Sequence, residues 1–197
     1  MLFGGLFENF LKESPLSVMA RATIEHALSA SALDDLFDRT AVHGYTKELL
    51  FSTTVDLMTL VVGGKALHVQ AAYQHLRARV PVTLKSVYDK LRNIEVEVSA
   101  GLVSHVSGRC ETLVTGLGGG CKSLLPGYRV RILDGNHLAA SQRRLGVTRG
   151  HTAGPLPGQS LVVLDPALML ITDVVPCEDA HTQERALIEQ VLPLVRE

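Results

Sequence analysis

Apolar residues recur at helical spacing through the first half of the chain and alternate with polar residues in parts of the second half. The first pattern is typical of helices with one buried face, and the second of half-buried strands. The helical pattern predicts one helix after Ser14-Pro15, a short one after Ser31, and a third between Thr46 and Gly63-Gly64. The third helix is apolar on nearly all sides, which predicts the buried centre of a bundle. The apolar positions are Leu16, Ala20, Ile24, Ala27 and Leu28; Leu33, Leu36 and Phe37; and Leu50, Thr54, Leu57, Met58 and Val61.

Two further helical stripes follow, with a sharp break between them. The first extends from Val69 to Val80, Pro81 interrupts it, and Thr83 can cap a second helix that we expect to continue to Leu102. A helix, a tight break and a second helix form the outline of a helix-turn-helix motif, which predicts DNA binding. An ordinary helical hairpin has the same outline and remains the alternative.

Positive charge is concentrated across this pair of helices. Residues 77–92 carry five cations and one carboxylate, five minus one or +4, whereas the net charge of the whole chain is −1. In a helix-turn-helix motif the start of the second helix lies in the major groove and flanking cations contact phosphates, so Lys85, Ser86 and Asp89 would face bases. The alternative is a solvated basic face. The five cations are Arg77, Arg79, Lys85, Lys90 and Arg92.

A glycine-rich stretch, residues 108–127, is expected to be a linker. Within it, TGLGGGCKS resembles a phosphate-binding loop. Such a loop needs Gly directly before its Lys-Ser pair and opens a helix. Cys121 occupies the place of that glycine, and Pro126 follows Lys122 closely. Nucleotide binding by Gly116–Ser123 is therefore only a remote alternative.

Three strands and one helix are expected beyond the linker. Tyr128–Leu133 alternates with the period of a strand, and Ser160–Leu164 and Leu168–Val175 predict an antiparallel hairpin around the Asp165-Pro166 turn. We expect a last helix, capped by Asp179 or Thr182, with an apolar inner face. The residues of that face are Leu187, Ile188, Val191 and Leu192.

Asp134 follows the first of these strands, in the sequence LDGN. Pro126-Gly127 predicts a turn before the strand, and Asp134-Gly135-Asn136 is expected to end it. A carboxylate held at the end of a strand is a suitable ligand for a divalent metal. The alternative is that Asp134 only caps its own turn.

Composition narrows the classes of protein. Hydrophobic residues make up 46% of the 197 residues, which is enough for a core, and the small net charge means that any nucleic-acid surface must be local. Cys110, Cys121 and Cys177 show no metal-ligand spacing and fit a reducing cytoplasm. The start is a poor signal peptide, and the longest apolar run, Leu49–Val62, contains Asp56 and is too short to span a membrane.

Five stretches resemble bacterial insertion-sequence transposases of the DDE class, in the group named after insertion sequence four. The similarity extends from about Phe10 to the last residue. The stretches are TKELLFSTTVDLMTLVV, AAYQHLRARVPVTLKSVYDKLRNIE, LPGYRVRILDGNHLAAS, GPLPGQSLVVLDP and VPCEDAHTQERALIEQVL.

The resemblance implies an α+β fold in two parts. Residues 1–107 would form a helical DNA-binding bundle that contains the helix-turn-helix-like pair. Residues 128–197 would form an incomplete ribonuclease-H-like core of three antiparallel strands and one helix. Asp134 would be the first of three catalytic carboxylates that together hold Mg²⁺. The motifs that carry the second aspartate and the glutamate do not occur, so we expect the truncated first half of such an enzyme.

The resemblance also implies a function. The chain would bind double-stranded DNA at the terminal inverted repeats of an insertion sequence, in DNA transposition, within the bacterial cytoplasm at the nucleoid. With one catalytic carboxylate it would be catalytically incomplete. Two alternatives are an inhibitor that competes with full-length transposase and one part of a split or frameshifted enzyme that a second chain completes. Phosphate contacts would come from Arg77, Arg79, Lys90, Arg92, Arg143 and Arg144.

Overall fold

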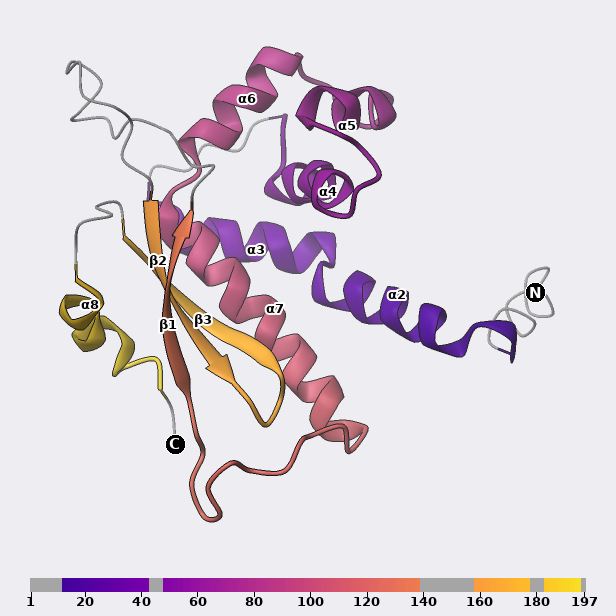
Figure 1. Ribbon diagram of the computed structural model, residues 1–197. Coiled ribbons are helices and arrows are strands. Elements are labelled where there is room, and N and C mark those ends of the chain that lie inside the picture. The colour runs from indigo at the N-terminus through magenta and orange to yellow at the C-terminus, as the bar shows by residue number, and fades with distance from the viewer. Residues whose placement is uncertain (1–11, 43–47, 139–157, 178–182, 196–197) are drawn as a thin grey trace. The chain divides into compact units, whose positions relative to one another are not determined.

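The computed structural model describes residues 12–42, 48–138, 158–177 and 183–195, without the side chains of 136–138 and 158–159. The chain divides into two compact units between Glu95 and Val96. Helices form the described part of the first unit, and the second combines helices with a three-stranded antiparallel sheet (Figure 1). The predicted α+β class is therefore confirmed. The sequence predicts a boundary after residue 107, but the helix that contains this residue belongs to the second unit.

Helices of the first unit occur where apolar spacing predicts them, although the helix that begins at Val69 ends at His75 rather than at Val80. The core lies among α4, α5 and α6 and comprises Leu49, Leu57, Ala66, Ala72, Tyr73, Val80 and Val87. Tyr73 Oη donates a hydrogen bond of 2.9 Å to the carbonyl of Val82, which fixes the α5–α6 connection to this core. The helices are α2 (Pro15–Ala27), α3 (Ala30–Thr40), α4 (Phe51–Val62), α5 (Val69–His75) and α6 (Leu84–Asn93).

Two side-chain contacts join α3 to α4. Asp34 accepts hydrogen bonds from the backbone nitrogen of Ser52 at 2.9 Å and from its hydroxyl at 2.8 Å. The rings of Phe37 and Phe51 stack with their centroids 5.1 Å apart. Asp34 thus supplies the start of α4 with an acceptor that Leu50, at the N-cap position, lacks. The expected cap, Thr46, lies outside the described residues.

The long helix expected after Thr83 is two helices. α6 ends at Asn93, and α7 (Val96–Gly116) begins after Ile94 adopts an extended conformation. Consequently α7 includes residues 108–116. The prediction that these nine residues belong to a linker is therefore wrong. Gly inside a helix is unfavourable by about 1 kcal/mol relative to Ala, but packing of a helix against a sheet can outweigh that preference. Here α7 packs along β3, where Ser104 Oγ donates to Asp173 at 2.8 Å.

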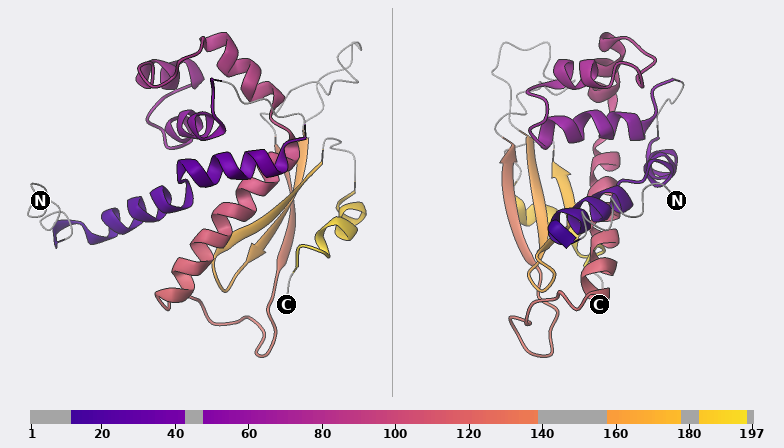
Figure 2. Two further views of the ribbon diagram at one scale, coloured as in Figure 1. Left: turned by 180° about the vertical axis from the view of Figure 1, so that it is seen from behind. Right: turned by 90° about the vertical axis from the view of Figure 1, so that its right-hand side faces the viewer.

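The sheet of the second unit has the order β1-β2-β3, and each neighbouring pair is antiparallel. Its strands are β1 (Ile132–Leu138), β2 (Gly158–Asp165) and β3 (Leu170–Cys177), and α8 (Glu184–Val191) follows. Figure 2 shows the sheet from two further sides, and Figure 1 shows α7 and α8 on opposite sides of it. The core of this unit is formed by Leu161, Val163, Val175, Leu187 and Val191. The predicted hairpin and the presence of the last helix are confirmed. However, its N-cap is Gln183 rather than Asp179 or Thr182, and of the expected inner face only Leu187 and Val191 are buried, whereas Ile188 and Leu192 are exposed.

The first strand lies later in the chain than its alternation predicts. The turn at Pro126-Gly127 is confirmed, since Gly127 has a φ of 82°. However, β1 starts at Ile132 and continues through Asp134-Gly135-Asn136, which was expected to end it. The reason is pairing: β2 supplies partners for each of these residues, and this outweighs the local turn preference of Asp-Gly.

The third strand also starts two residues later than expected. Leu168 belongs to the β2–β3 turn, where its backbone nitrogen donates to Asp165 Oδ1 at 3.3 Å. Met169 follows with a φ of 54°, in the left-handed region. The strand then continues through Pro176, which was expected to end it and which lies opposite Ser160. Within the described residues, no helix has the length and apolar character needed to cross a membrane.

Candidate functional site

The outer face of α6 contains the residues predicted to read DNA. Thr83 caps the helix, accepting a hydrogen bond from the backbone nitrogen of Ser86 at 3.2 Å. Val87 is fully buried in the core and fixes the inner face. Lys85 and Ser86 lie exposed in the first turn, and Tyr88, Asp89 and Arg92 lie one and two turns further along the outer side.

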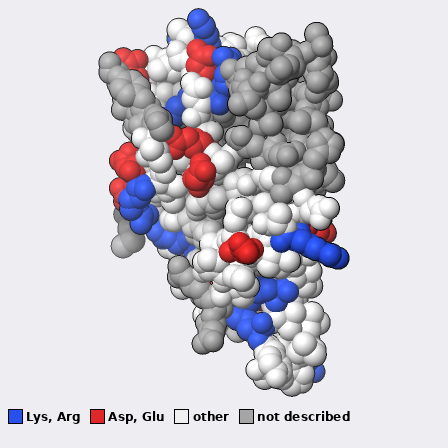
Figure 3. All heavy atoms as spheres, turned by 90° about the vertical axis from the view of Figure 1, so that its left-hand side faces the viewer, with Lys and Arg blue, Asp and Glu red and all other residues white. Residues whose placement is uncertain are grey.

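Several predicted DNA-contacting cations already have partners in their own unit. Arg79 Nη2 lies 3.6 Å from Asp56, and Arg92 Nη2 lies 3.4 Å from Asp89. Arg77 Nη1 donates to the carbonyl of Val80 at 3.0 Å. Figure 3 shows where Lys and Arg and where Asp and Glu side chains lie on one face of the described residues. The sequence charge of +4 therefore overstates the local field, because carboxylates from other helices lie among the cations.

Lys90 lies on the inner side of α6, although the sequence analysis predicts that it contacts DNA phosphates. Its ammonium lies 4.0 Å from the centre of the Phe37 ring, a cation–π contact. Partial burial lowers the pKa of Lys90 below its ordinary value, and the charges of Asp34 and Asp38 only partly oppose that shift. Lys90 therefore attaches α6 to α3. Arg143 and Arg144, also predicted to contact phosphates, lie outside the described residues.

Asp134 lies within β1, opposite Val162, rather than at the end of the strand. Cross-strand partners share a face, so Asp134 is on the face opposite to Leu161 and Val163, which pack against α8. Its side chain is exposed. Within the described ranges, no three His, Cys, Asp or Glu side chains form a group that could hold a metal ion. The described carboxylates therefore do not assemble a Mg²⁺ site, and Asp134 alone does not fit one.

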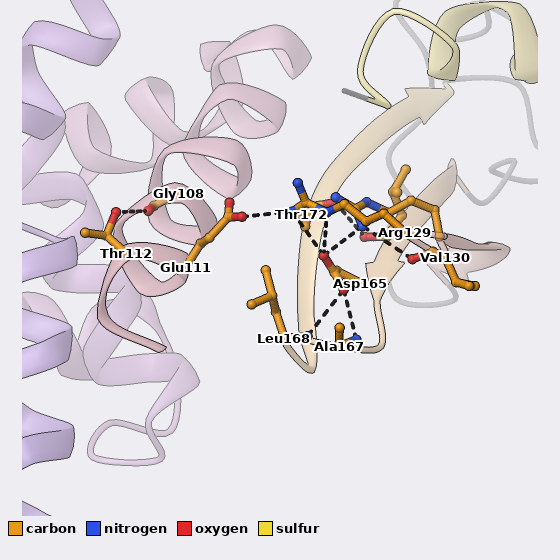
Figure 4. Close-up of polar contacts among 11 residues, drawn as sticks. Gly108, Glu111, Thr112, Arg129, Val130, Asp165, Ala167, Leu168 and Thr172 are labelled. Atoms are coloured by element: carbon orange, nitrogen blue, oxygen red, sulfur yellow. Dashed lines mark hydrogen bonds and ion pairs between the residues drawn. The ribbon is translucent and has the colours of Figure 1, made fainter. Parts of the chain in front are cut away.

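The most highly connected polar cluster surrounds Asp165, at the end of β2 (Figure 4). Asp165 is 1% exposed, and its Oδ1 accepts from the backbone nitrogens of Ala167 at 2.9 Å and Leu168 at 3.3 Å. Its Oδ2 lies 2.7 Å from Arg131 Nη1 and accepts from Arg129 Nη2 at 3.2 Å. The expected role of Asp165 in the hairpin turn is confirmed, and its carboxylate has no room for a metal between two guanidinium groups.

Glu111 of α7 completes this cluster. It accepts from Arg129 Nη2 at 2.8 Å, so two acids and two arginines balance each other. Burial disfavours the charged guanidinium of Arg129, but hydrogen bonds and charge from Asp165 and Glu111 outweigh it and raise the pKa of Arg129. The sequence prediction did not include these arginines. Arg129 and Arg131 are two residues apart directly before β1, so their side chains point to the same side. This spacing was the signal in the sequence that could have indicated them.

The phosphate-loop alternative is not supported by the backbone. After α7 ends at Gly116, residues 117–131 are all described and contain no helix. A phosphate-binding loop directs its amides to phosphate at the start of the helix that follows it. Lys122 therefore lies in an exposed turn region without that helix.

Comparison of the chain with protein families, curated proteins and solved structures finds no match.

Proposed function

We propose that the chain binds double-stranded DNA through α6, as a protein related to the transposases that its sequence resembles. One observation carries this proposal: α6 is attached to a core on one side and presents Lys85, Ser86, Asp89 and Arg92 on the other. A helix held in this way can enter a groove as a rigid body. The α5–α6 pair is proposed to act as a helix-turn-helix motif.

The dimensions and polarity of α6 suit this role. Its 10 residues extend for about 15 Å, and the major groove, about 12 Å wide, admits one helix. The first turn carries Lys85 and Ser86, where the positive end of the helix dipole also favours phosphate oxygens. Asp89 can accept a hydrogen bond from a base amino group, and its ion pair with Arg92 is solvent-exposed and easily exchanged.

Affinity is expected to be modest and strongly salt-dependent. Most of the described cations assigned to DNA have an internal partner, so we expect roughly two to four phosphate contacts and a slope of log K against log salt of about −2 to −4. The proposed target is the terminal inverted repeat of an insertion sequence. Base readout by only a few side chains gives limited sequence discrimination, so a mixed-sequence duplex is also expected to bind.

The test measures anisotropy of a labelled mixed-sequence duplex between about 50 and 200 mM KCl. Lys85→Ala should weaken binding at every salt concentration and reduce the salt slope by about 1. Lys122→Ala removes another exposed lysine, from the second unit, and serves as the matched control, with no expected change. Salt-independent binding, or equal effects of the two substitutions, would contradict the proposal.

A catalytic contribution of Asp134 is proposed only in partnership with another chain, because the described residues do not form a metal site. If the chain inhibits full-length transposase, co-expression should reduce transposition, and Asp134→Ala should inhibit equally well. If the chain is one part of a split enzyme, a second chain with the other carboxylates should restore transposition only while Asp134 is present. An unchanged transposition frequency in both assays would contradict both roles.

A further inference from the structure

The described apolar side chains of β1 are only partly buried and give its position in the sheet little support. Ile132 is 42% exposed and Leu133 is 40% exposed, and neither belongs to the core of the second unit. Among the described residues, β1 pairs with a strand on one side only. Its sequence, ILDGNHL, alternates poorly between polar and apolar residues. Because burial of one face normally selects the register of a strand, these features specify the register of β1 only weakly.

The register of β1 determines where Asp134 points. In the observed register Ile132 lies opposite Leu164 and Asp134 opposite Val162. Successive side chains of a strand point to opposite faces, so a slip by one residue turns every side chain to the other face. A slipped β1 would direct Asp134 toward the face that packs against α8.

The Asp165 cluster holds the chain directly before β1. Continuing the observed register by one residue places Arg131 beside Asp165, and the two side chains are 2.7 Å apart. Arg129, two residues earlier, also binds Asp165, through Nε at 3.3 Å and Nη2 at 3.2 Å. Asp165 in turn is fixed by the backbone of the β2–β3 turn. After a slip, Arg131 would lie opposite Leu164 or Pro166, and the buried carboxylate would lose its nearest cation.

We propose that Asp165 is a positioning residue that sets the register of β1 and thereby the face on which Asp134 lies. Its two carboxylate oxygens have different partners: Oδ1 accepts hydrogen bonds from the turn amides, and Oδ2 binds the two arginines. A buried carboxylate that loses its cations is strongly unfavourable, so the slipped registers are disfavoured by this one group. The functional importance of that face rests on the proposed role of Asp134, whereas the effect on register does not.

The experiment traps the register by disulfide formation in the full chain. Cys110, Cys121 and Cys177 are replaced by Ser, and Asp134→Cys is combined with Val162→Cys, its observed partner, or with Leu161→Cys or Val163→Cys, its partners after a slip in either direction. Directly opposite residues have the Cα spacing that a disulfide needs. With Asp165 present, only the 134–162 pair should form. Asp165→Asn should reduce the yield of that pair and produce the 134–161 or the 134–163 pair.

Asp173→Asn is the matched control, because it removes a carboxylate from the same sheet that binds Ser104 rather than the arginines. It should leave the 134–162 yield unchanged. If Asp165→Asn does not fold, Glu111→Gln, which removes only the half-exposed partner of Arg129, should shift the yields in the same direction. Unchanged yields in a folded Asp165→Asn chain, or an equal effect of Asp173→Asn, would overturn the proposal.

DNA binding measured on the same variants separates the two proposals. The Asp165→Asn chain should bind DNA as tightly as the parent, because the proposed DNA contacts lie on α6. If neither chain binds DNA but the disulfide pairs change as expected, the proposed function fails and the register proposal stands. If both chains bind DNA and the pairs do not change, the register proposal alone is overturned.

Discussion

Gly135 lies beneath the side chain of Glu184, which comes from the first turn of α8. A Cβ at position 135 would overlap the carboxylate and the Cγ of Glu184. Glycine inside a strand is otherwise unfavourable, because it loses more backbone freedom on folding than any other residue. The close approach of Glu184 therefore favours a glycine at this position, because a larger residue would require the Glu184 side chain to shift.

We predict that the effect of Gly135→Ala changes sign with the residue at position 184. In the parent chain the added methyl should displace Glu184 and lower the free energy of unfolding by about 1 kcal/mol. In a Glu184→Ala background the three atoms nearest to the added methyl are removed, and the same substitution should raise the free energy of unfolding by about 0.5–1 kcal/mol. Urea unfolding of the four chains measures both values. An effect of the same sign in both backgrounds would contradict this account of the contact.

Lys90 gives a pH dependence with a defined sign. Its pKa is lowered in the folded chain, mainly by burial, whereas the unfolded chain has the ordinary value near 10.5. Between these two values the unfolded state binds more protons, so the contribution of Lys90 to stability rises with pH. The free energy of unfolding of the parent minus that of Lys90→Met should therefore increase from pH 8 toward pH 10. Denaturant unfolding at several pH values measures it, and a constant or falling difference would argue against a lowered pKa.

Two aspartates of the second unit, Asp134 and Asp165, show what a sequence can reveal about single residues. The turn role of Asp165 was predictable, since Asp-Pro between two apolar runs is a local signal. Its arginine partners come from a segment 34 and 36 residues away, as the numbers of Arg131 and Arg129 show, and no local pattern indicates them. Asp134 was placed at a strand end because its own neighbours favour a turn, whereas the distant β2 extends the strand past it.

At the scale of secondary structure, α6 is the element with the most local support. Thr83 accepts from the Ser86 backbone and shares a 2.9 Å hydrogen bond with the Ser86 hydroxyl. Apolar residues on one side of α6 pack in the core. Lys90 and Arg92 lie in its last turn, where positive charges interact favourably with the helix dipole. Helices of this kind are predictable because their signals lie within about one turn of each other. β1 lacks such local signals, and its bounds were predicted wrongly.

Removing the cap of α6 should weaken both the helix and DNA binding. Thr83→Ala is expected to lower the free energy of unfolding by about 1 kcal/mol, because a first-turn amide loses its acceptor. Thr112→Ala is the matched control: Thr112 Oγ1 donates back to the carbonyl of Gly108 within α7, an interaction that contributes little to helix stability. Thermal and urea unfolding give the two values. Equal losses for the two substitutions would mean that the Thr83 cap has no special role.

At the scale of the whole molecule, each compact unit has its own hydrophobic core. Leu57 is completely buried in the first core, and Val163 is 1% exposed in the second. The sequence predicted a helical part followed by a part that contains strands, but placed a boundary inside α7. The reason is that glycine content was used as the sign of a linker, whereas the long-range contact between α7 and β3 decides where that helix belongs.

We predict that core substitutions act mainly within their own unit. Leu57→Ala should destabilise the first unit by about 2–5 kcal/mol, as deletion of buried methyl groups does in other cores. Val163→Ala is the corresponding change in the second core. Amide hydrogen exchange, followed separately for residues 51–93 and 96–177, should accelerate only in the unit that carries the substitution. Similar acceleration in both units would indicate that they unfold as one.

The position of β1 at the border of the sheet has a consequence for any study of Asp134. Among the described residues, one side of β1 leaves backbone N–H and carbonyl groups open to another strand, and such borders are templates for intermolecular association. Charged side chains on border strands discourage that association, and Asp134 is the charged residue of β1. Neutralising Asp134 to examine catalysis would therefore also remove a safeguard against aggregation. Reduced activity of such a variant carries information about chemistry only when the protein is still monodisperse.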